Sequence, residues 1–481
     1  MPDETQRTRL DRRRWIPLWI AGVILGSQLL VEPIVGLADN GDFGNVSNAF
    51  SIFRAEPDHP APYFSYVVQH WRADRSQRPQ FRVLSSELLL LAPSVVAVAY
   101  LAGAGYDLRW AGLTHLAVFL ATLYILYPVL AQLPGRRPVV AWGLLLLVWC
   151  DVSYFSYFNS FYTDTASLLF LLLLIALYLR LAAGVGKPRN NAFAFLVVCG
   201  LFLTSKAQHA VLVVLLAPWL LLDPNLAAAL GRRVRVLAAL LLTAMAAACL
   251  RYLPPEYRAY AAYNVIFAEL LPKAPDAKAV LRELGLPENL ARYAGKDAFH
   301  PESAMRQGAL RADFGNLPSH VQLVRHYGKH PGVAARLIGA ALEESALQRP
   351  EGFGNFTVTS SQPPRARSEA FAVWSNIKRA IFQRRPRLYG SFLIALGLAF
   401  LFTVWGSARR SLGTAVVFSG LAAIEFLLGA LADCRETTRH LFLFHAMQDA
   451  ALLFVVIQGL AVWRWECGRV IRARQLMDTS T

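Results

Sequence analysis

Long apolar segments recur along almost the whole chain and restrict its fold more than any other feature of the sequence. A helix needs roughly 20 apolar residues to cross ~30 Å of hydrocarbon, where its backbone amides must all bond internally. Eleven segments meet or approach this length: 15–37, 83–103, 110–133, 139–158, 165–183, 192–205, 207–222, 234–253, 388–405, 412–432 and 441–463. Only 17% of the residues are charged and the mean hydropathy is +0.38, which excludes a soluble domain. The sequence therefore predicts an all-α polytopic membrane protein.

The first apolar segment, 15–37, follows a run of arginines and has two interpretations. It resembles a signal peptide in position, but its apolar stretch is long. The sequence Val35-Gly36-Leu37-Ala38 is also a poor cleavage site. We expect an uncleaved anchor that begins in the cytoplasm.

Basic residues in the short turns between the apolar segments predict the topology. They are Arg136-Arg137, Lys187 with Arg189, Arg232-Arg233-Arg235 and Arg409-Arg410, together with the N-terminus and Arg464 through Arg474. If segment 83–103 does not cross, about ten spans remain and every one of these clusters falls in the cytoplasm. We therefore predict that 83–103 is a re-entrant or interfacial helix on the outer side. Both termini are then cytoplasmic.

The chain divides into three parts under this topology. Residues 1–253 form an N-terminal transmembrane module with a first outer loop at 38–82, and residues 388–481 form the C-terminal transmembrane helices and a basic tail. Residues 254–387 form a mostly helical extracytoplasmic region, with helices expected at Ala277 to Leu284 and Val333 to Leu347.

The net charge of +16 does not indicate nucleic acid binding, because the basic residues lie mostly in short turns. Much of this charge is expected to fix the topology, and membrane lipids are among the expected partners of the chain. The five cysteines have no spacing typical of a metal site or a disulfide framework.

Polar residues gather at the predicted outer ends of several spans, where they are costly. The first group is Asp39-Asn40-Gly41-Asp42-Phe43-Gly44, directly after the first span. Either carboxylate is a candidate general base, because burial at this depth would raise its pKa. The alternative is an Asn-Gly turn whose aspartate caps a following helix.

A second group, Asn159 to Asp164, precedes the span that starts at Thr165. Asp164 or Thr163 is expected to cap that helix, or to contribute to a polar site.

Two basic groups lie at the same predicted depth. Thr204 to His209 interrupts an apolar stretch, so Lys206 and His209 need partners there. Those partners are either Asp164 or Asp42, as a structural ion pair, or the phosphate of an anionic lipid. Arg439 and His440, before the last span, are candidate phosphate ligands or contacts of lipid headgroups.

The order of these motifs resembles the GT-C superfamily of glycosyltransferases, which use sugars linked to polyprenyl phosphate. Asn40-Gly41-Asp42-Phe43-Gly44 and Asn159 to Asp164 are similar to its two acidic outer loops, and Ser205-Lys206 is similar to its Thr/Ser-Lys turn. Within it the chain most resembles bacterial S-layer glycan hexose transferases. The residues that carry this are Tyr263-Asn264, Glu283-Leu284-Gly285-Leu286-Pro287, His330-Pro331-Gly332, Gly354-Asn355-Phe356 and Arg439-His440-Leu441-Phe442.

The resemblance implies an inverting hexose transfer from a polyprenyl-phosphate donor to a glycan or lipid-linked acceptor, in the cytoplasmic membrane with the site outside. Asp42, or Asp39 in its place, would be the base. The expected substrate-binding residues are Asn159, Asp164, Lys206, Gln208, His209, Arg439 and His440. No cofactor is expected, and Thr163-Asp164 replaces a more acidic pair, which argues against a divalent metal. The alternative function is a transporter or flippase of a lipid-linked glycan.

Overall fold

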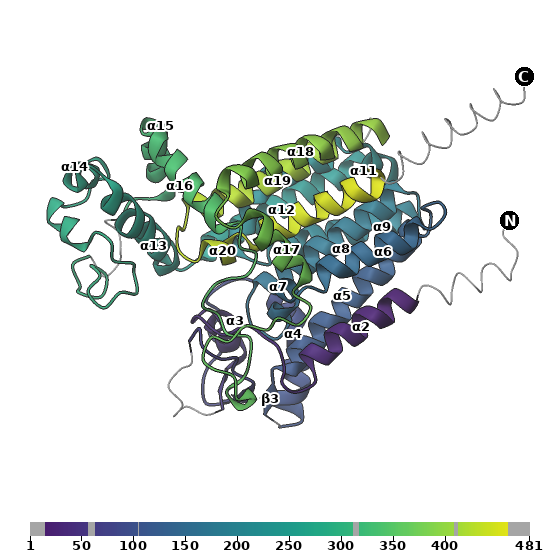
Figure 1. Cartoon of the computed structure of the whole chain (residues 1–481), viewed down its shortest axis with the longest axis horizontal. Coiled ribbons are helices and arrows are strands. Elements are labelled where there is room, and N and C mark those ends of the chain that lie inside the picture. Colours follow the sequence, from purple (N-terminus) through teal and green to yellow (C-terminus); the bar gives the residue numbers. More distant parts are fainter. Residues whose placement is uncertain (1–14, 56–62, 104, 311–316, 408–411, 460–481) are drawn as a thin grey trace, which may run out of the picture.

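The computed structural model describes residues 15–55, 63–103, 105–310, 317–407 and 412–459 (Figure 1). The basic N-terminus, Arg409-Arg410 and the basic C-terminal tail lie outside the described residues.

Apolar helices form a bundle that occupies the right-hand side of Figure 1. Its long helices are α2 (Trp15–Leu29), α5 (Arg109–Leu130), α6 (Arg137–Trp149), α8 (Asp164–Ala182), α9 (Pro188–Leu203), α10 (Val213–Leu222), α12 (Arg232–Tyr252), α18 (Pro386–Ser407), α19 (Leu412–Leu431) and a last helix, Phe442–Gly459. Short elements join them: α7 (Val152–Phe155), η3 (Ser156–Phe158), η4 (Ala207–Leu212), α11 (Pro224–Ala229) and α20 (Thr437–His440).

Six of these helices are long and apolar enough to cross a membrane, and the bent pair of α6 with Val152–Phe158 makes a seventh. Four shorter apolar helices accompany them: Trp15–Leu29, Glu87–Leu101, Pro188–Leu203 and Ala207–Leu222. The count of about ten spans therefore stays a prediction. Helix α8 lies at the centre of the bundle, because 72% of its apolar window is buried, whereas only 17% of that of α18 is. The chain is thus a polytopic α-helical membrane protein.

The ends of several bundle helices meet at what we call the loop end. The Asn159 amide donates to the Leu29 carbonyl at 2.8 Å, where α2 ends. Its Oδ1 lies against Gly112 in the first turn of α5, where an added Cβ would come within 2.1 Å. Asn159 therefore fastens the α7–α8 connection to two other helix ends.

The segment predicted not to cross forms α4 (Glu87–Val95), continued by the π-helical η2 (Val96–Leu101). It starts at the loop end, because the Ser86 amide donates to Thr204 O at 3.0 Å, just after α9. It is followed by β3 and by α5, which begins at the same end. The chain is therefore at the loop end both before α4 and at the start of α5, and the placement of 83–103 as a non-crossing helix stays a prediction.

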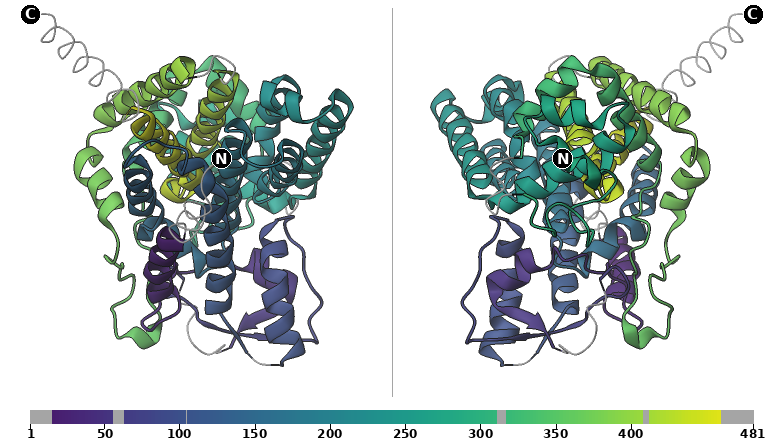
Figure 2. Two further views of the ribbon diagram at one scale, coloured as in Figure 1. Left: turned by 90° about the vertical axis from the view of Figure 1, so that its right-hand side faces the viewer. Right: turned by 90° about the vertical axis from the view of Figure 1, so that its left-hand side faces the viewer.

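The first loop and the short segment before α5 form a small sheet that the sequence did not predict. Strands β1 (Ile52–Arg54), β2 (His70–Ala73) and β3 (Tyr106–Asp107) pair antiparallel in the order β1-β2-β3. The register places Phe53 opposite Arg72 and Trp71 opposite Tyr106. Figure 2 shows the sheet below the helix bundle, beside the loop elements α3 (Gly44–Ser47) and η1 (Asn48–Phe50).

Residues 260–337 have an apolar core of their own, left of the bundle in Figure 1, whereas residues 373–382 lie against the bundle, where Lys378 Nζ is 3.1 Å from Asp449 Oδ1. Both stretches belong to the mostly helical segment 254–387. Its elements are α13 (Pro255–Tyr263), η5 (Asn264–Leu270), η6 (Leu271–Lys273), α14 (Ala277–Glu283), η7 (Glu288–Tyr293), α15 (His320–Lys329), α16 (Pro331–Glu344), η8 (Val358–Ser360) and α17 (Val373–Phe382). The two helices expected from the sequence are α14 and α16.

Local sequence explains where these helices start. Asp276 accepts from two amides of the first turn of α14, and Ser319 with Gln322 forms a capping box at α15. Proline occupies the first position of α16, where its missing amide hydrogen costs nothing.

Candidate active site at the loop end

Arg439 is the centre of a charged cluster at the loop end. Its guanidinium lies 2.9 Å from Asp42 Oδ2, 3.7 Å from Asp164 Oδ2 and 2.8 Å from Glu436 Oε2. Burial alone would lower the pKa of Arg439, but the carboxylates of Glu436, Asp42 and Asp164 outweigh it and raise the pKa. Only 6% of the side chain is exposed, so the arginine is fixed by these contacts. A planar fork of donors suits this shared position better than a lysine.

Lys206 completes the cluster from the turn after α9. Its Nζ donates to Asp164 Oδ1 at 2.9 Å, and the lysine backbone is extended (φ −144°) where the apolar stretch is interrupted. This is the structural ion pair that the sequence left open. Asp164 does not cap α8 with its side chain. Its carboxylate instead contacts both Lys206 and Arg439.

The two aspartates of the first loop differ in what they contact. Asp39 Oδ1 accepts from the amides of Gly41 at 2.6 Å and Phe43 at 3.2 Å, and its Oδ2 pairs with Arg54 at 2.7 Å. Burial raises the pKa of Asp39, although these hydrogen bonds and Arg54 oppose the rise. Gly41 has φ +110°, a backbone conformation that residues with a Cβ rarely adopt. The turn therefore depends on both Asp39 and Gly41.

Asp42 lies at the exposed edge of the cluster, and about a third of its side chain is accessible to solvent. It does not cap the following helix with its side chain. Its Oδ1 instead accepts from the Tyr257 hydroxyl at 3.3 Å. The geometry therefore favours Asp42 over Asp39 as the carboxylate that a substrate can reach.

The sequence reasoning missed two members of this site, Tyr257 and Glu436. Tyr257 lies in α13, far along the chain, and accepts from Asn45 at 2.8 Å. Glu436 accepts from Asn40 Nδ2 at 2.8 Å and has a left-handed backbone (φ 51°) at the start of α20. Its acidic charge between two arginines was visible in the sequence, but the contact with Asn40 was not.

Tyr162 contacts both the first loop and Arg439. Its hydroxyl donates to Ala38 O at 2.8 Å and accepts from the amide of Asn40 at 3.0 Å. The Arg439 guanidinium lies over its ring, 5.3 Å from the centroid, which adds a cation–π contact.

His440 lies at the edge of the cluster, with Nε2 3.6 Å from Asp433 Oδ2. Burial, Arg439 and Lys206 lower the pKa of His440 well below its usual range, so it is neutral at pH 7. Burial raises the pKa of Asp433 to about 6. His440 is therefore available as a neutral hydrogen-bonding group.

Three expected binding residues make their contacts elsewhere. Gln208 and His209 both contact Glu425, each at 2.8 Å, and His209 Nε2 lies 3.0 Å from Ser167 Oγ. Ser167 in turn contacts Ser205, so these residues back the Lys206 turn from within the bundle. The Asn159 amide is fully buried on backbone carbonyls. The structure thus brings Asp42, Asp164, Lys206, Arg439 and His440 together and separates Asn159, Gln208 and His209 from them.

The donor set of the cluster does not fit a divalent metal between Asp42 and Asp164. A cation there would have to displace the guanidinium that contacts both carboxylates. Lys206 also occupies the other oxygen of Asp164.

The fold and the cluster define a multi-pass membrane protein with a charged, partly exposed site where its helix ends meet. Residues 7–476 match the model of the YfdI N-terminal transmembrane domain, and the chain belongs to that family. No curated protein matches it. Among solved structures, the chain is similar to the Archaeoglobus fulgidus oligosaccharyltransferase in the apo form, with 12% identity and a TM-score of 0.41. That match covers 95% of this chain and 52% of the archaeal chain, so this chain spans about half the length of the archaeal protein.

Proposed function

We propose that the chain is a GT-C-type membrane glycosyltransferase. It would move a hexose from a polyprenyl-phosphate donor to a glycan or lipid-linked acceptor, with inversion at the anomeric carbon. The observation that carries the proposal is the contact of Arg439 with both Asp42 and Asp164. Asp164 also pairs with Lys206 and so brings it into the cluster. A carboxylate base and two phosphate-binding cations are the groups that such a transfer needs, and here they meet at the ends of apolar helices.

Asp42 is the general base in this proposal. Its carboxylate takes the proton of the acceptor hydroxyl while the acceptor oxygen forms a bond to the anomeric carbon. The bond between that carbon and the phosphate oxygen breaks, and polyprenyl phosphate leaves with the electron pair. Asp42 is suited to this because its side chain is the most exposed of the three carboxylates that contact Arg439.

Lys206 and Arg439 hold the leaving phosphate in this proposal. The cluster contains three carboxylates (Asp42, Asp164 and Glu436) against two cations, so it carries a net negative charge. A donor phosphate must therefore compete with a carboxylate for Arg439. Displacing Asp42 from the guanidinium would free its oxygen to act as a base.

Asp164 and His440 have supporting roles. Asp164 contacts both cations and is almost fully buried, so it positions them. His440 is neutral and hydrogen-bonds a donor oxygen without adding charge. The site faces outward from a cytoplasmic membrane, with both chain termini in the cytoplasm, as the basic turns predict.

A transfer assay with purified protein in detergent tests the proposal. The protein is given a panel of radiolabelled polyprenyl-phosphate hexoses and a lipid-linked glycan acceptor, and labelled product is separated from donor. We expect product with the wild-type chain and its loss in Asp42→Asn, with an unchanged elution profile. If the same protein, reconstituted into vesicles, moves the donor across the membrane without forming any product, it is a flippase instead. If no donor of this class binds, the glycosyltransferase proposal fails.

A further inference from the structure

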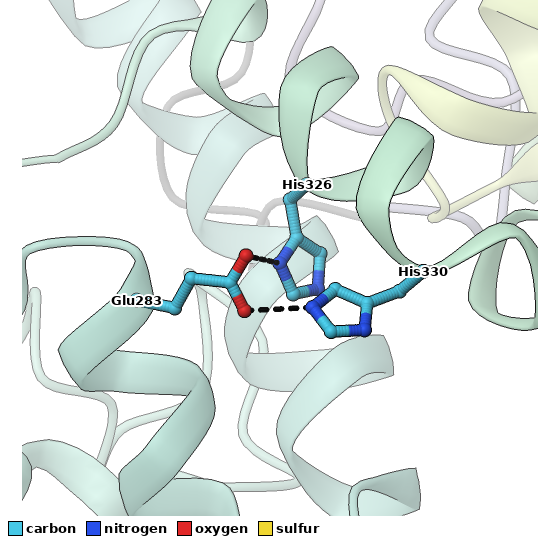
Figure 3. Close-up of side chains that lie close together, drawn as sticks. All are labelled: Glu283, His326 and His330. Atoms are coloured by element: carbon cyan, nitrogen blue, oxygen red, sulfur yellow. Dashed lines mark hydrogen bonds and ion pairs between the residues drawn. The ribbon is translucent and has the colours of Figure 1, made fainter.

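Three side chains of the types that ligate metals meet in the 254–387 region, away from the charged cluster of the loop end. Glu283 ends α14, His326 lies in α15, and His330 lies between α15 and α16 (Figure 3). Each offers one ligand atom, and these atoms all lie within 4.8 Å of one another. Glu283 and His330 belong to motifs that the proposed transfer does not use.

The chain places the two imidazoles together for a simple reason. His326 lies in the last turn of α15 and His330 directly follows that helix, with its amide donating to the His326 carbonyl at 2.9 Å. Their ring centroids are 4.6 Å apart. The carboxylate of Glu283 faces both rings from α14, with Oε1 3.3 Å from His326 Nδ1 and Oε2 2.7 Å from His330 Nε2.

His326 has an unmet requirement. Only 4% of the residue is exposed, and its Nδ1 is buried without a well-formed hydrogen bond among the described residues. The 3.3 Å separation from Glu283 Oε1 suits two ligands of one ion, because bonds of about 2.0–2.2 Å at tetrahedral angles separate ligand atoms by roughly this distance.

A cavity of about 260 Å³ opens beside the three ligands. Its walls also include Glu269, Asp276 and Val280. Zinc sites with two histidines and one glutamate keep a fourth position for water or another small ligand. The cavity has room for that fourth ligand.

One cation already competes for this position. Lys329 Nζ lies 3.7 Å from Glu283 Oε1, but 69% of its side chain is exposed. Because the lysine is free to turn into solvent, it weakens metal binding without preventing it.

We propose that Glu283, His326 and His330 form a Zn²⁺ site that clamps α14 to the α15–α16 corner. The clamp lies close to the link between the two regions, because Tyr327, next to His326, donates to Leu431 O at 2.9 Å. Leu431 ends α19 and precedes the segment that carries Arg439. The site does not depend on the proposed transferase activity.

Zinc binding by the 481-residue chain tests the proposal. Protein purified without a histidine tag is treated with chelator, and Zn²⁺ is added during calorimetry, with metal content measured afterwards. We expect one tightly bound zinc per chain, and a loss of affinity in Glu283→Gln and His330→Asn greater than the roughly 10–100-fold typical of outer-shell changes. Both residues are partly exposed, so these variants are expected to fold; thermal unfolding without metal checks this.

Two further variants make the test specific. Lys329→Ala removes the competing cation and is expected to tighten zinc binding, which a non-specific surface site would not do. His70→Asn changes an exposed histidine elsewhere and is expected to leave the affinity unchanged. Zinc should raise the melting temperature of the wild type and of Lys329→Ala but not of His330→Asn. Equal zinc content in the wild type and His330→Asn, or no stoichiometric zinc in the wild type, would overturn the proposal.

Discussion

The guanidinium of Arg439 lies 2.9 Å from the carboxylate of Asp42, although one residue precedes the last membrane helix and the other follows the first. The same guanidinium also contacts Asp164 and Glu436. The buried Arg439 guanidinium therefore links the first loop and the segment before the last helix to α8, at the centre of the bundle.

Replacing Arg439 should destabilise the protein strongly. Arg439→Gln leaves three carboxylates facing one another around a buried neutral side chain, and breaking a buried ion pair in this way costs about 3–5 kcal/mol. Thermal unfolding in detergent should show a large fall in melting temperature. Asp164→Asn in the same background should restore part of the loss, because it removes one of the repelling charges. An unchanged melting temperature in Arg439→Gln would contradict the observed contacts.

The two aspartates of the first loop should respond differently to alanine. Asp39→Ala removes two hydrogen bonds from backbone amides and the partner of Arg54, at a cost of about 1–3 kcal/mol. Asp42→Ala should cost less, because its side chain is about one-third exposed, yet it should abolish transfer. Thermal unfolding and activity measured on both variants separate the two roles. Equal loss of stability with retained activity in Asp42→Ala would reverse the assignment.

Asp433 should give the unfolding free energy a dependence on pH. Its folded pKa of about 6 lies above the ordinary value of 3.8, so the folded state binds a proton more tightly than the unfolded state. The stabilising contribution is therefore present below pH 4 and is lost as the pH rises through 6. Unfolding measured from pH 4 to 8 should show this decrease in the wild type relative to Asp433→Asn. A difference between the two that is constant over that range would refute the assignment.

Cysteine labelling tests the orientation of the helix bundle. In a background without native cysteines, Ser76→Cys in the first loop should react with a membrane-impermeant maleimide on intact cells, because the residue is exposed and predicted to lie outside. Arg136→Cys, in the turn between α5 and α6, should react only after the cells are opened. Labelling of Arg136→Cys from outside would exclude the ten-span topology.

Much of the fold could be predicted from the sequence because membrane helices are specified locally, by length and apolarity. The small sheet could not, since its strands are three, four and two residues long and depend on pairing across distant segments. Helices α14 and α16 could also be predicted, because their starts are marked locally, by the capping Asp276 and by Pro331.

Four charged residues that meet in the candidate site were singled out from the sequence, namely Asp42, Asp164, Lys206 and Arg439, but Glu436 was not. Burial cost indicated that Lys206 needed a partner, and Asp164 is that partner. Gln208 and His209 face Glu425 instead, because the interrupted helix turns them toward α19. The contact of Tyr257 with Asp42 joins two regions far apart along the chain, and no local pattern encodes it.

Donor binding compared in two variants tests the division of labour in the cluster most directly. Polyprenyl-phosphate hexose is titrated into the wild type, Asp42→Asn and Lys206→Met, with binding and product formation measured on the same samples. If the lysine holds phosphate and the aspartate only accepts a proton, Asp42→Asn should bind donor at least as tightly as the wild type while losing about 10²–10⁴-fold in rate. Lys206→Met should bind about tenfold or more weakly, the loss expected for a charge-assisted contact. Unchanged donor affinity in Lys206→Met, together with normal turnover in Asp42→Asn, would contradict the roles proposed for these two residues.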